Sequence, residues 1–351
     1  MTVRPTIAYC APQAFHFVRK DIEGLRTKCT VLVHLFEHGA KWMLPFDLLH
    51  QLWFLLNARR SGVRDVFVHF GGYHAILPIL LGFRTHIIIA GSDACSFPGI
   101  RYGGFRKQPL ASVLRFVYGR ATTLLPVHAS LERFVNTFSE HGPTEQGYGT
   151  LARSTTARSV AIPYGFDVDQ WPLADTTTER EGAICVAFGA RWNDAVHFRK
   201  GLDIIIACAR MMPTMRFTIV GVADPSGYMD VPGNLTVLGK VLPERLHQLL
   251  VRHSLYLQPS LMEGFPNAVC EAMLAGCVPI VSNITSMPDI VDGLGEVVYR
   301  SDATALGTAI QRVAVDPART NHAARRTIRA RIAPLTLERR IAALLAVTDQ
   351  N

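Results

Sequence analysis

Two glutamates, Glu263 and Glu271, stand eight positions apart in the stretch Gln258 to Ser282, where a strand-like run gives way to a helical one. Ligands in open parallel sheets bind at such strand-to-helix junctions. The start of a helix offers free backbone N–H groups and the positive end of a dipole, and Gly264 lets the backbone approach a ligand, so this junction suits a phosphate. Ionised carboxylates accept hydrogen bonds from sugar hydroxyls. The pattern predicts a site for a nucleotide diphosphate with a sugar at each end, although spacing alone favours an ordinary loop acid and an ordinary helix acid.

The same stretch closely resembles the signature of the retaining, GT-B fold glycosyltransferases of family 4, which carry two glutamates in a P-S-x-x-E-G-F-P-N-x-x-x-E-A-M context. Ile162 to Asp167 is similar to the family's I-P-N-G-V-D, with Tyr164 in place of the usual Asn, and Phe188 to Asp203 is similar to its G-R and K-G-x-D motifs. The resemblance covers the C-terminal half well and the N-terminal half weakly. The matching signature residues are Pro259, Ser260, Glu263, Gly264, Phe265, Pro266, Asn267, Glu271, Ala272, Met273, Gly276 and Pro279.

The resemblance implies a role for each matching residue. Glu271 would bind the nucleoside ribose and Glu263 the donor sugar, while Arg191 and Lys200 would bind the diphosphate, on which charge builds as it departs. Lys200 taken alone could also be an ordinary surface lysine. The segment 192–199 is an apparent insertion relative to the family, and Arg199 could take either cationic role. The diphosphate is expected on the backbone around the helix start, at Gly264, Phe265, Pro266, Asn267 and Ala268.

Two further residues are expected near the nucleoside base. Gly221 closes an expected strand and matches the family glycine near the nucleoside, and Lys240 stands where the base usually rests on main chain. Both positions also suit ordinary turns.

The N-terminal half departs from the family pattern. Asp93 matches a family segment that lines the cleft between the domains, and we expect it near the transferred sugar, although a turn-forming aspartate is an alternative. Relatives often place a histidine just before that segment, whereas this chain has Ala90; His69, His128 or main-chain carbonyls could fill the space. The loop after the first strand, residues 11–16, lacks the usual glycines, which puts its contact with the donor in doubt.

Charge is distributed unevenly along the chain. The 36 basic and 28 acidic residues give a net charge of +8, and residues 1–170 hold 18 basic and 11 acidic residues, an excess of seven. Such a half suits a negatively charged acceptor or an anionic membrane surface, unless the charge is ordinary solvated surface. The apolar, tryptophan-bearing stretch Lys41 to Arg60 could dip into lipid headgroups, although a core helix with an exposed aromatic edge is the favoured interpretation.

Other composition features exclude several classes of protein. The arginine-rich stretch Arg319 to Arg340 has no interleaved aromatic residues, so we interpret it as solvated helix faces and expect no nucleic-acid partner. The seven cysteines form no C-x-x-C pair and are expected to be buried thiols of a reducing cytosol. We expect no signal peptide and no membrane-spanning helix, and hence a cytoplasmic protein that is peripheral at the inner face of the cell membrane.

Short β-branched runs alternate with helical periods along the chain, which predicts an α/β fold with two doubly wound, Rossmann-like domains. The expected division is an acceptor-binding domain over residues 1–165, a nucleotide-sugar-binding domain over 166–333, and a C-terminal helix over 334–351 that packs back towards the first domain. Strands are expected at 6–10, 30–35, 66–69, 86–90, 123–127, 160–163, 183–188, 216–221, 235–238, 254–258 and 278–282, helices at 46–59, 73–81 and 129–138, a mobile loop at 142–159, a linker at 163–182, and helix from 302 to the end.

The sequence therefore predicts a retaining glycosyltransferase that moves a sugar from a nucleotide donor, with UDP favoured, to a glycan or lipid-linked glycan in polysaccharide or glycolipid biosynthesis. No cofactor and no metal are expected. The alternatives are a sugar-nucleotide epimerase or hydrolase on the same fold, and a non-catalytic subunit that only binds nucleotide sugars.

Overall fold

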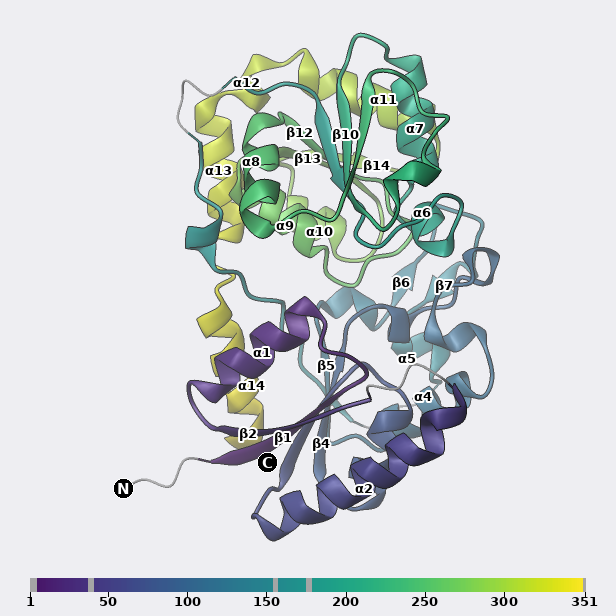
Figure 1. The fold of residues 1–351 in the computed structure, drawn as a ribbon, viewed down its shortest axis with the longest axis vertical. Helices are drawn as coiled ribbons and strands as arrows, with labels where there is room; N and C mark the ends of the chain where they lie inside the picture. Colours follow the sequence, from purple (N-terminus) through teal and green to yellow (C-terminus); the bar gives the residue numbers. More distant parts are fainter. Residues whose placement is uncertain (1–4, 37–40, 154–156, 175–178, 350–351) are drawn as a thin grey trace.

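The computed structural model describes residues 5–36, 41–153, 157–174 and 179–349, which form two parallel six-stranded sheets with helices on their faces (Figure 1). A two-stranded antiparallel ribbon completes the strand pairing. The predicted α/β architecture with two doubly wound domains is confirmed.

The first sheet has the strand order β2-β1-β3-β4-β5-β8, with every neighbouring pair parallel. The chain reverses direction across the sheet between β1 and β3, so the carboxyl ends of these two strands flank the crevice where such sheets bind ligands. Strand β4 is buried at five of its six residues because helices cover both faces. The strands are β1 (Thr6–Ala11), β2 (Thr30–Leu35), β3 (Asp65–His69), β4 (Arg84–Ile89), β5 (Thr123–Pro126) and β8 (Arg158–Ser159).

The second sheet has the order β11-β10-β9-β12-β13-β14, again parallel throughout. Its reversal point lies between β9 and β12, and the loop that carries Glu263 follows β12 directly. The strands are β9 (Ala183–Val186), β10 (Phe217–Val222), β11 (Leu235–Gly239), β12 (Leu255–Gln258), β13 (Val278–Ser282) and β14 (Glu296–Val298).

Helices of the first domain divide between the two faces of its sheet. Helix α1 packs with the C-terminal helix α14 on one face, whereas α2, α3 and α4 neighbour one another on the other (Figure 1). The bounds are α1 (His16–Arg26), α2 (Leu44–Arg60), α3 (Ile76–Leu80), α4 (Leu110–Tyr118), α5 (Tyr148–Leu151) and α14 (Leu337–Asp349).

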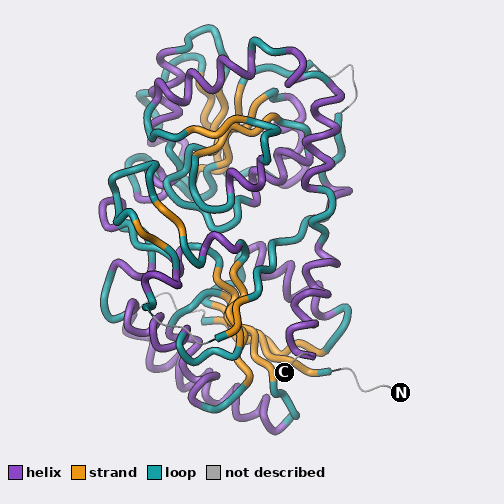
Figure 2. The backbone as a smooth tube through the Cα atoms, turned by 180° about the vertical axis from the view of Figure 1, so that it is seen from behind, coloured by secondary structure: helices purple, strands orange, loops and turns teal. Residues whose placement is uncertain are grey.

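The chain crosses between the domains twice, and Figure 2 shows both crossings on one side of the molecule. The return crossing ends in α14, where buried Arg340 donates from Nε and Nη2 to the two carboxylate oxygens of Asp21 on α1, both at 2.6 Å. The expected domain limits after residues 165 and 333 fall within these crossings and remain predictions. The second-domain helices are α6 (Ala195–Arg199), α7 (Leu202–Met211), α8 (Pro243–Arg252), α9 (Asn267–Leu274), α10 (Met287–Val291), α11 (Ala303–Ala314), α12 (Pro317–Thr320) and α13 (His322–Ile332).

Most expected strands are present within a residue or two of their predicted ends, but the segment 129–163 differs. The helix expected at 129–138 is wrong, because β6 (Phe134–Val135) pairs there with β7 (Glu145–Gln146) in an antiparallel ribbon. The expected loop at 142–159 is partly ordered: Gln146 is buried and exchanges two hydrogen bonds with the Ser96 backbone, at 2.9 and 2.8 Å. Residues 154–156 of that loop lie outside the described residues. Residues 160–163 form no strand, although the Val160 N–H still donates to the Leu124 carbonyl beside them. Strand β14 was not expected, since only three residues form it.

The interpretation of the C-terminal arginines as solvated helix faces holds for exposed Arg326, Arg331 and Arg339 but is wrong for Arg325 and Arg329. Arg325 is buried and donates to the Gly276 carbonyl at 2.8 Å, while Arg329 donates to the Leu274 carbonyl at 2.7 Å. Arg180 donates to the intervening Ala275 carbonyl at 2.8 Å. Three guanidinium groups therefore satisfy the carbonyls that the end of α9 leaves free and neutralise the negative end of its dipole.

All seven cysteines are buried and free, as expected. Over the described ranges, no helix combines the length and the hydropathy needed to cross a bilayer.

Candidate active site

Glu263 is the centre of an ion-pair cluster just beyond the carboxyl end of β12. Its Oε1 accepts from the Lys200 Nζ at 2.7 Å and from an Arg199 guanidinium nitrogen at 3.0 Å, and Gln258 and Ser260 each donate to it at 3.2 Å. The Glu263 and Lys200 side chains are each 12% exposed. Burial alone would raise the pKa of Glu263, but the charges of Lys200 and Arg199 outweigh it and the pKa is lowered. Glu263 is therefore ionised at neutral pH.

The apparent insertion at 192–199 is what brings the cations to this carboxylate. It folds into α6, which begins where the Asp194 side chain accepts from the His197 N–H at 2.7 Å. The buried His197 ring lies against Trp192, with ring centroids 5.2 Å apart, and anchors the segment. Helix α6 ends at Arg199, so Arg199 and Lys200 both reach the cluster. From the sequence, Arg199 was only a possible substitute for Arg191 or Lys200, but in the structure it belongs to the Glu263 cluster.

Arg191 lies before the insertion and is exposed. Its charge acts on Asp224, whose pKa is lowered mainly by hydrogen bonds from Ser226 and to a smaller extent by Arg191. Among the described residues, it makes no contact with the Glu263 cluster. A role in diphosphate binding remains a prediction for Arg191.

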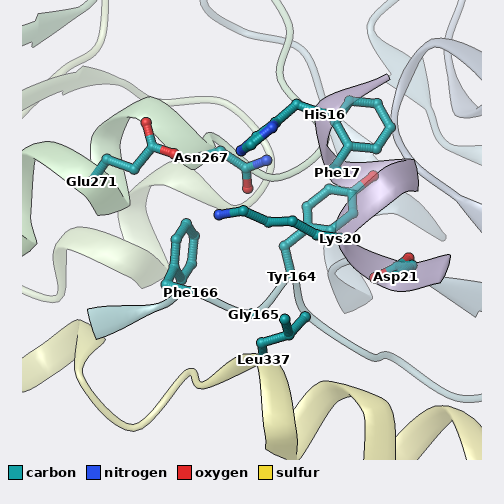
Figure 3. Close-up of a pocket in the computed structure, with 10 residues that line it drawn as sticks. All are labelled: His16, Phe17, Lys20, Asp21, Tyr164, Gly165, Phe166, Asn267, Glu271 and Leu337. Atoms are coloured by element: carbon teal, nitrogen blue, oxygen red, sulfur yellow. The ribbon is translucent and has the colours of Figure 1, made fainter. Parts of the chain in front are cut away.

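Glu271 lies on α9 and faces a pocket between the two domains (Figure 3). Burial raises the pKa of Glu271 to about 7, and the charge of Lys20 on α1 acts in the opposite direction. The carboxylate therefore titrates near neutral pH. The pocket is lined by His16, Phe17, Lys20, Asp21, Tyr164, Gly165, Phe166, Asn267, Glu271 and Leu337.

The start of α9 offers fewer free amides than the sequence suggests. Pro266 has no N–H, the Asn267 N–H donates to the Phe265 carbonyl at 3.0 Å, and the two amides after Ala268 donate to the Pro266 carbonyl. In the described part of the chain, Ala268 keeps the one first-turn N–H that donates to no carbonyl. The Asn267 Oδ1 atom is buried and has no hydrogen-bond partner there. Among the described residues, the Ala268 N–H and the Asn267 Oδ1 are therefore the groups at the helix start that remain available to a ligand.

Gly264 is needed for a contact between the domains. A Cβ atom at Gly264 would lie 1.8 Å from the Ala90 carbonyl oxygen, and one at Gly91 would lie 2.8 Å from the Gly264 Cα. Both distances are too short for any side chain. The loop after β4 in the first domain therefore rests directly on the loop after β12 in the second, so the close approach expected for Gly264 is to protein backbone.

Asp93 holds the first of these two loops in shape. Its Oδ1 accepts from the Ala90 and Gly91 N–H groups at 3.1 Å, and its Oδ2 accepts from the Gly71 N–H at 2.8 Å and the Tyr118 hydroxyl at 3.0 Å. Burial raises the pKa of Asp93 even though these bonds lower it. Both oxygens are engaged with the protein, which makes Asp93 a positioning residue in this structure; contact with the transferred sugar remains a prediction.

His69 was one candidate for the position of the family histidine, but both nitrogens of its ring are engaged within the protein. It is fully buried, with Nδ1 2.7 Å from the Tyr9 hydroxyl and Nε2 3.0 Å from the Tyr164 hydroxyl. Burial lowers the pKa of His69 well below its ordinary value, so the ring is neutral. Tyr164, the departure from the family's Asn, is thus tied into the first domain.

His128 lies at the contact between the domains. Its ring centroid is 6.5 Å from that of Phe265, and its Nε2 lies 3.6 Å from a carboxylate oxygen of Asp289 on α10. Burial lowers the pKa of His128, with Asp289 acting against it. Of the two histidines considered from the sequence, His128 is the one beside the loop that follows β12.

The two residues expected near the base lie at one end of the second sheet. Gly221 has a positive φ of 95° within β10, and its carbonyl accepts from the Gly189 N–H at 2.8 Å. The Lys240 Nζ lies 5.6 Å from the ring centroid of Phe188, which is 65% exposed. An exposed aromatic ring beside the reversal point of the sheet could stack a nucleobase.

Three site residues were missed in the sequence. His16 and Lys20 line the pocket with Glu271, although the loop before them lacks the expected glycines. The Arg199 guanidinium lies over the Tyr102 ring, 5.0 Å from the ring centroid. The only available signal was position: His16 and Lys20 begin the first helix after β1, at the reversal point of the first sheet.

No group of three or more His, Cys, Asp or Glu side chains that could hold a metal ion occurs within the described ranges. The cluster around Glu263 contains two cations, Lys200 and Arg199, and one carboxylate. Its hydrogen-bond donors suit an anionic ligand.

Two parallel doubly wound sheets that face each other across a pocket define a protein of GT-B fold. Solved structures of similar fold include sucrose-phosphate synthase from Thermosynechococcus elongatus, with a TM-score of 0.73 and 16% identity over 99% of both chains. HepE from Anabaena, solved in complex with UDP, has a TM-score of 0.72 and 14% identity over 99% of this chain and 100% of that one. At these identities the likeness concerns the fold.

Residues 185–316 match the family described as glycosyl transferases group 1. The chain is 28% identical over 108 residues to the gpi3 subunit of phosphatidylinositol N-acetylglucosaminyltransferase from Schizosaccharomyces pombe, covering 27% of this chain and 24% of that protein. It is 35% identical over 78 residues to O-antigen chain mannosyltransferase B from Escherichia coli, covering 22% of this chain and 20% of that protein. The chain thus matches about a quarter or less of the length of each of these curated relatives.

Proposed function

We propose that the protein is a retaining glycosyltransferase that uses a nucleotide-sugar donor. The observation that carries this proposal is the arrangement around α9: a buried, ionised Glu263 held by Lys200 and Arg199 in the loop before the helix, and Glu271 on the helix at the pocket between the domains. A diphosphate bound between them would meet two cations and the free Ala268 N–H. The family match over residues 185–316 supports the same assignment.

In the proposed reaction, an acceptor hydroxyl attacks the anomeric carbon from the face that the diphosphate leaves. The bond from the anomeric carbon to the diphosphate oxygen breaks, a bond to the acceptor oxygen forms, and the hydroxyl proton passes to the departing diphosphate. Lys200 and Arg199 stabilise the negative charge that develops on that group. Glu263 accepts from a hydroxyl of the donor sugar, and Glu271 accepts from the ribose.

UDP is the proposed nucleotide and a glycan or lipid-linked glycan the proposed acceptor. HepE, a structural neighbour, was solved with UDP and with UDP-glucose, which supports the choice of base. The cations of the cluster take the charge-neutralising role that a divalent metal would otherwise fill, so we propose a metal-independent reaction. Full activity after EDTA treatment is the expected result, and strict dependence on a divalent ion would contradict it.

Transfer of label tests the function directly. The purified protein is incubated with labelled UDP-sugars, with and without a membrane extract, and the products are separated. Label in an extract glycan with release of UDP is the expected result. Isomerised or hydrolysed donor would indicate an epimerase or a hydrolase, and binding seen only as a raised melting temperature would indicate a non-catalytic subunit.

The proposed membrane contact rests on α2 and the turn before it, whose outward face is apolar. Five large apolar side chains recur every three or four residues and point into solvent, with Trp42 at 73% and Trp53 at 65% exposure. The opposite, buried face of the same helix includes Asp47 and Gln51. The favoured interpretation, a core helix with an exposed aromatic edge, is confirmed, because one face of α2 is buried while an apolar stripe on the other is exposed. This stripe consists of Trp42, Phe46, Leu49, Trp53 and Leu56.

An anionic lipid surface is the proposed occupant of this stripe. Tryptophans on a helix face within a half-chain that carries seven excess positive charges combine apolar insertion with attraction to anionic headgroups. Arg59 is a poor residue to test, because it lies 4.7 Å from the Phe83 ring centroid and donates to the Leu81 carbonyl. Arg60 is exposed and suits a charge reversal.

Sedimentation with vesicles of three parts phosphatidylcholine to one part phosphatidylglycerol tests the contact. The wild type should sediment at low salt and less at high salt, and Trp42→Ser with Trp53→Ser should reduce sedimentation at least tenfold. Met229→Ser with Val315→Ser, which changes two exposed apolar residues of the second domain, is the matched control and should have no effect. No sedimentation of the wild type at low salt, or a dimer that the tryptophan variant abolishes, would contradict a lipid partner.

A further inference from the structure

A second pocket lies at the carboxyl ends of β3 and β4, on the first domain. It has a volume of about 260 Å³, room for a small group rather than a whole drug-sized ligand, and its lining includes Phe70, Gly71, Asp93, Arg101, Tyr102 and Arg106. The loops after these two strands are the ones that face the second domain across the cleft. The pocket therefore opens on the side of the first sheet where such folds bind ligands.

Tyr102 connects this pocket to the Glu263 cluster. It lines the pocket, while the face of its ring contacts the Arg199 guanidinium, which itself donates to Glu263. Gly71 and Asp93, which also line the pocket, belong to the loop network that rests on Gly264. A group bound in the pocket would thus lie next to the position proposed for the donor sugar.

The charge of the pocket is positive and uncompensated. Arg101 and Arg106 are exposed, and over the described ranges neither forms an ion pair. The one carboxylate in the lining, Asp93, is occupied by the Ala90, Gly91 and Gly71 amides and the Tyr118 hydroxyl. Two guanidinium groups at one pocket offer up to ten N–H donors, a combination that fits phosphate oxygens.

The backbone at Arg101 is held in a conformation that an arginine seldom adopts. Its φ is 55° and its ψ 32°, in the left-handed region, and the loop is closed by two hydrogen bonds between Phe97 and Tyr102, at 2.8 and 3.0 Å. Gly103 packs so tightly that a Cβ there would lie 2.3 Å from the Cys95 carbonyl oxygen. Glycine or asparagine would fit position 101 at lower cost, so the local backbone does not account for an arginine. Residues held in this way cluster at ligand sites.

We infer that this pocket binds a phosphate group of the acceptor, through Arg101 and Arg106. The inference rests on the proposed glycosyltransferase function and specifies its acceptor as a phosphate-bearing molecule. The phosphate fixes the acceptor in the first domain, beside Tyr102, while its hydroxyl reaches the sugar held at Glu263. The phosphate could belong to a lipid-linked acceptor or to a soluble sugar or polyol phosphate, and the same side chains would bind either.

The test measures binding to protein already saturated with UDP, so that the donor diphosphate site is closed to the probe. The probes are short-chain phosphatidic acid against the matched diacylglycerol, and glycerol 3-phosphate against glycerol, followed by calorimetry. We expect binding of a phosphate-bearing probe and none of its phosphate-free partner. Binding of both phosphate probes would indicate a soluble source, and binding of the lipid alone a lipid-linked one.

The variant that carries the test is Arg101→Asn with Arg106→Gln. Asparagine tolerates the left-handed conformation, so the charge is removed while the loop geometry is kept. Affinity for the phosphate probe should fall at least tenfold, whereas affinity for UDP should stay within twofold and so show that the variant is folded. Lys107→Gln, on the same loop but outside the pocket lining, is the control and should leave both affinities unchanged.

Equal binding of phosphate-bearing and phosphate-free probes, or equal affinity of wild type and double variant for the phosphate probe, would overturn the inference. Failure of the wild type to bind UDP or any UDP-sugar would instead overturn the proposed function. The two failures are distinguishable because the calorimeter reports each ligand separately.

Discussion

The carboxyl edges of the two sheets face one another, and they differ in whether their basic side chains are paired with an acid. At the edge of the second sheet, Lys200 and Arg199 are paired with Glu263. At the edge of the first sheet, Arg101 and Arg106 are exposed, and across the described ranges they form no ion pair. A preformed ion cluster orients its members for one defined ligand, whereas free guanidinium groups are available to capture an anion. Under the proposed function, the edge of the second sheet positions the donor and the edge of the first sheet attracts the acceptor.

Removal of the central carboxylate should have the largest effect on the donor side. Glu263→Gln takes away the acceptor of a donor-sugar hydroxyl and leaves Lys200 and Arg199 without their partner, so turnover should fall by about 10²–10³-fold. Because breaking a buried ion pair costs about 3–5 kcal/mol, the melting temperature should fall as well. Steady-state kinetics and thermal melting measure both. Unchanged turnover with a UDP-sugar and its acceptor would contradict the role given to Glu263.

Lys200 and Arg191, the two residues predicted to bind the diphosphate, should differ in how much their removal weakens UDP binding. Lys200→Ala should weaken UDP binding by roughly ten- to a hundredfold, because one charged hydrogen bond contributes about 1.5–3 kcal/mol. The structure leaves exposed Arg191 outside the cluster, so Arg191→Ala should change UDP affinity less than Lys200→Ala does. Calorimetry with UDP makes the comparison. A larger loss in Arg191→Ala would transfer the diphosphate role to Arg191 and show that the insertion moves on binding.

The contact between the two edges can be broken by a single methyl group. Gly264→Ala would place a Cβ 1.8 Å from the Ala90 carbonyl oxygen, so the domains could not close as they do here. We expect turnover to fall at least tenfold while UDP affinity changes by less than threefold, since UDP binds to the second domain. Gly233→Ala, a change with open space around it in the same domain, is the control. Equal loss of UDP affinity and turnover would mean that Gly264 contacts the nucleotide itself.

Sequence reasoning reached the second domain more fully than the first. Glu263 and Glu271 lie on one motif whose spacing is fixed by one strand, one loop and one helix, so their relative placement follows from local order. Lys200, 63 residues before Glu263, was singled out by the family resemblance instead. Arg199 and Tyr102 meet only because separate loops of the two domains converge, and no local pattern encodes that. Buried Arg325 and partly buried Arg329 were misread for a similar reason: their partners are carbonyls at the end of α9, about fifty residues away in sequence.

The helix α2 shows a second limit of sequence reasoning. The hydrophobic periodicity of α2 is ambiguous, because apolar residues occur all around the helix. Only the tertiary fold decides which face of the helix is buried. The fold buries Asp47 and Gln51 and exposes Trp42 and Trp53, contrary to hydrophobicity alone. The ribbon β6–β7 likewise depends on pairing between segments of two residues each, too short for any period to be seen.

The smallest expected effect concerns pH. Burial raises the pKa of Glu271 from 4.5 to about 7, so ionisation of this carboxyl lowers the stability of the folded protein as pH rises from about 4.5 to about 7, and below that window the cost is absent. If the ionised form binds the ribose, affinity for UDP-glucose should rise by up to about tenfold between pH 6 and pH 8. Both phosphates of UDP-glucose stay ionised over this range. The rise should be missing in Glu271→Gln, and a rise of equal size in that variant would assign the titration to another group.

The central claim is that the start of α9 holds a nucleotide diphosphate with Glu271 on its ribose. The most direct measurement is the affinity of UDP for the wild type and for Glu271→Gln, with Glu244→Gln, an acid in the first turn of α8 in the same domain, as the control. We predict that UDP binds the wild type, that Glu271→Gln weakens it at least tenfold at pH 8, and that Glu244→Gln leaves it unchanged. UDP affinities that are equal in all three proteins, or no UDP binding to the wild type, would contradict the claim.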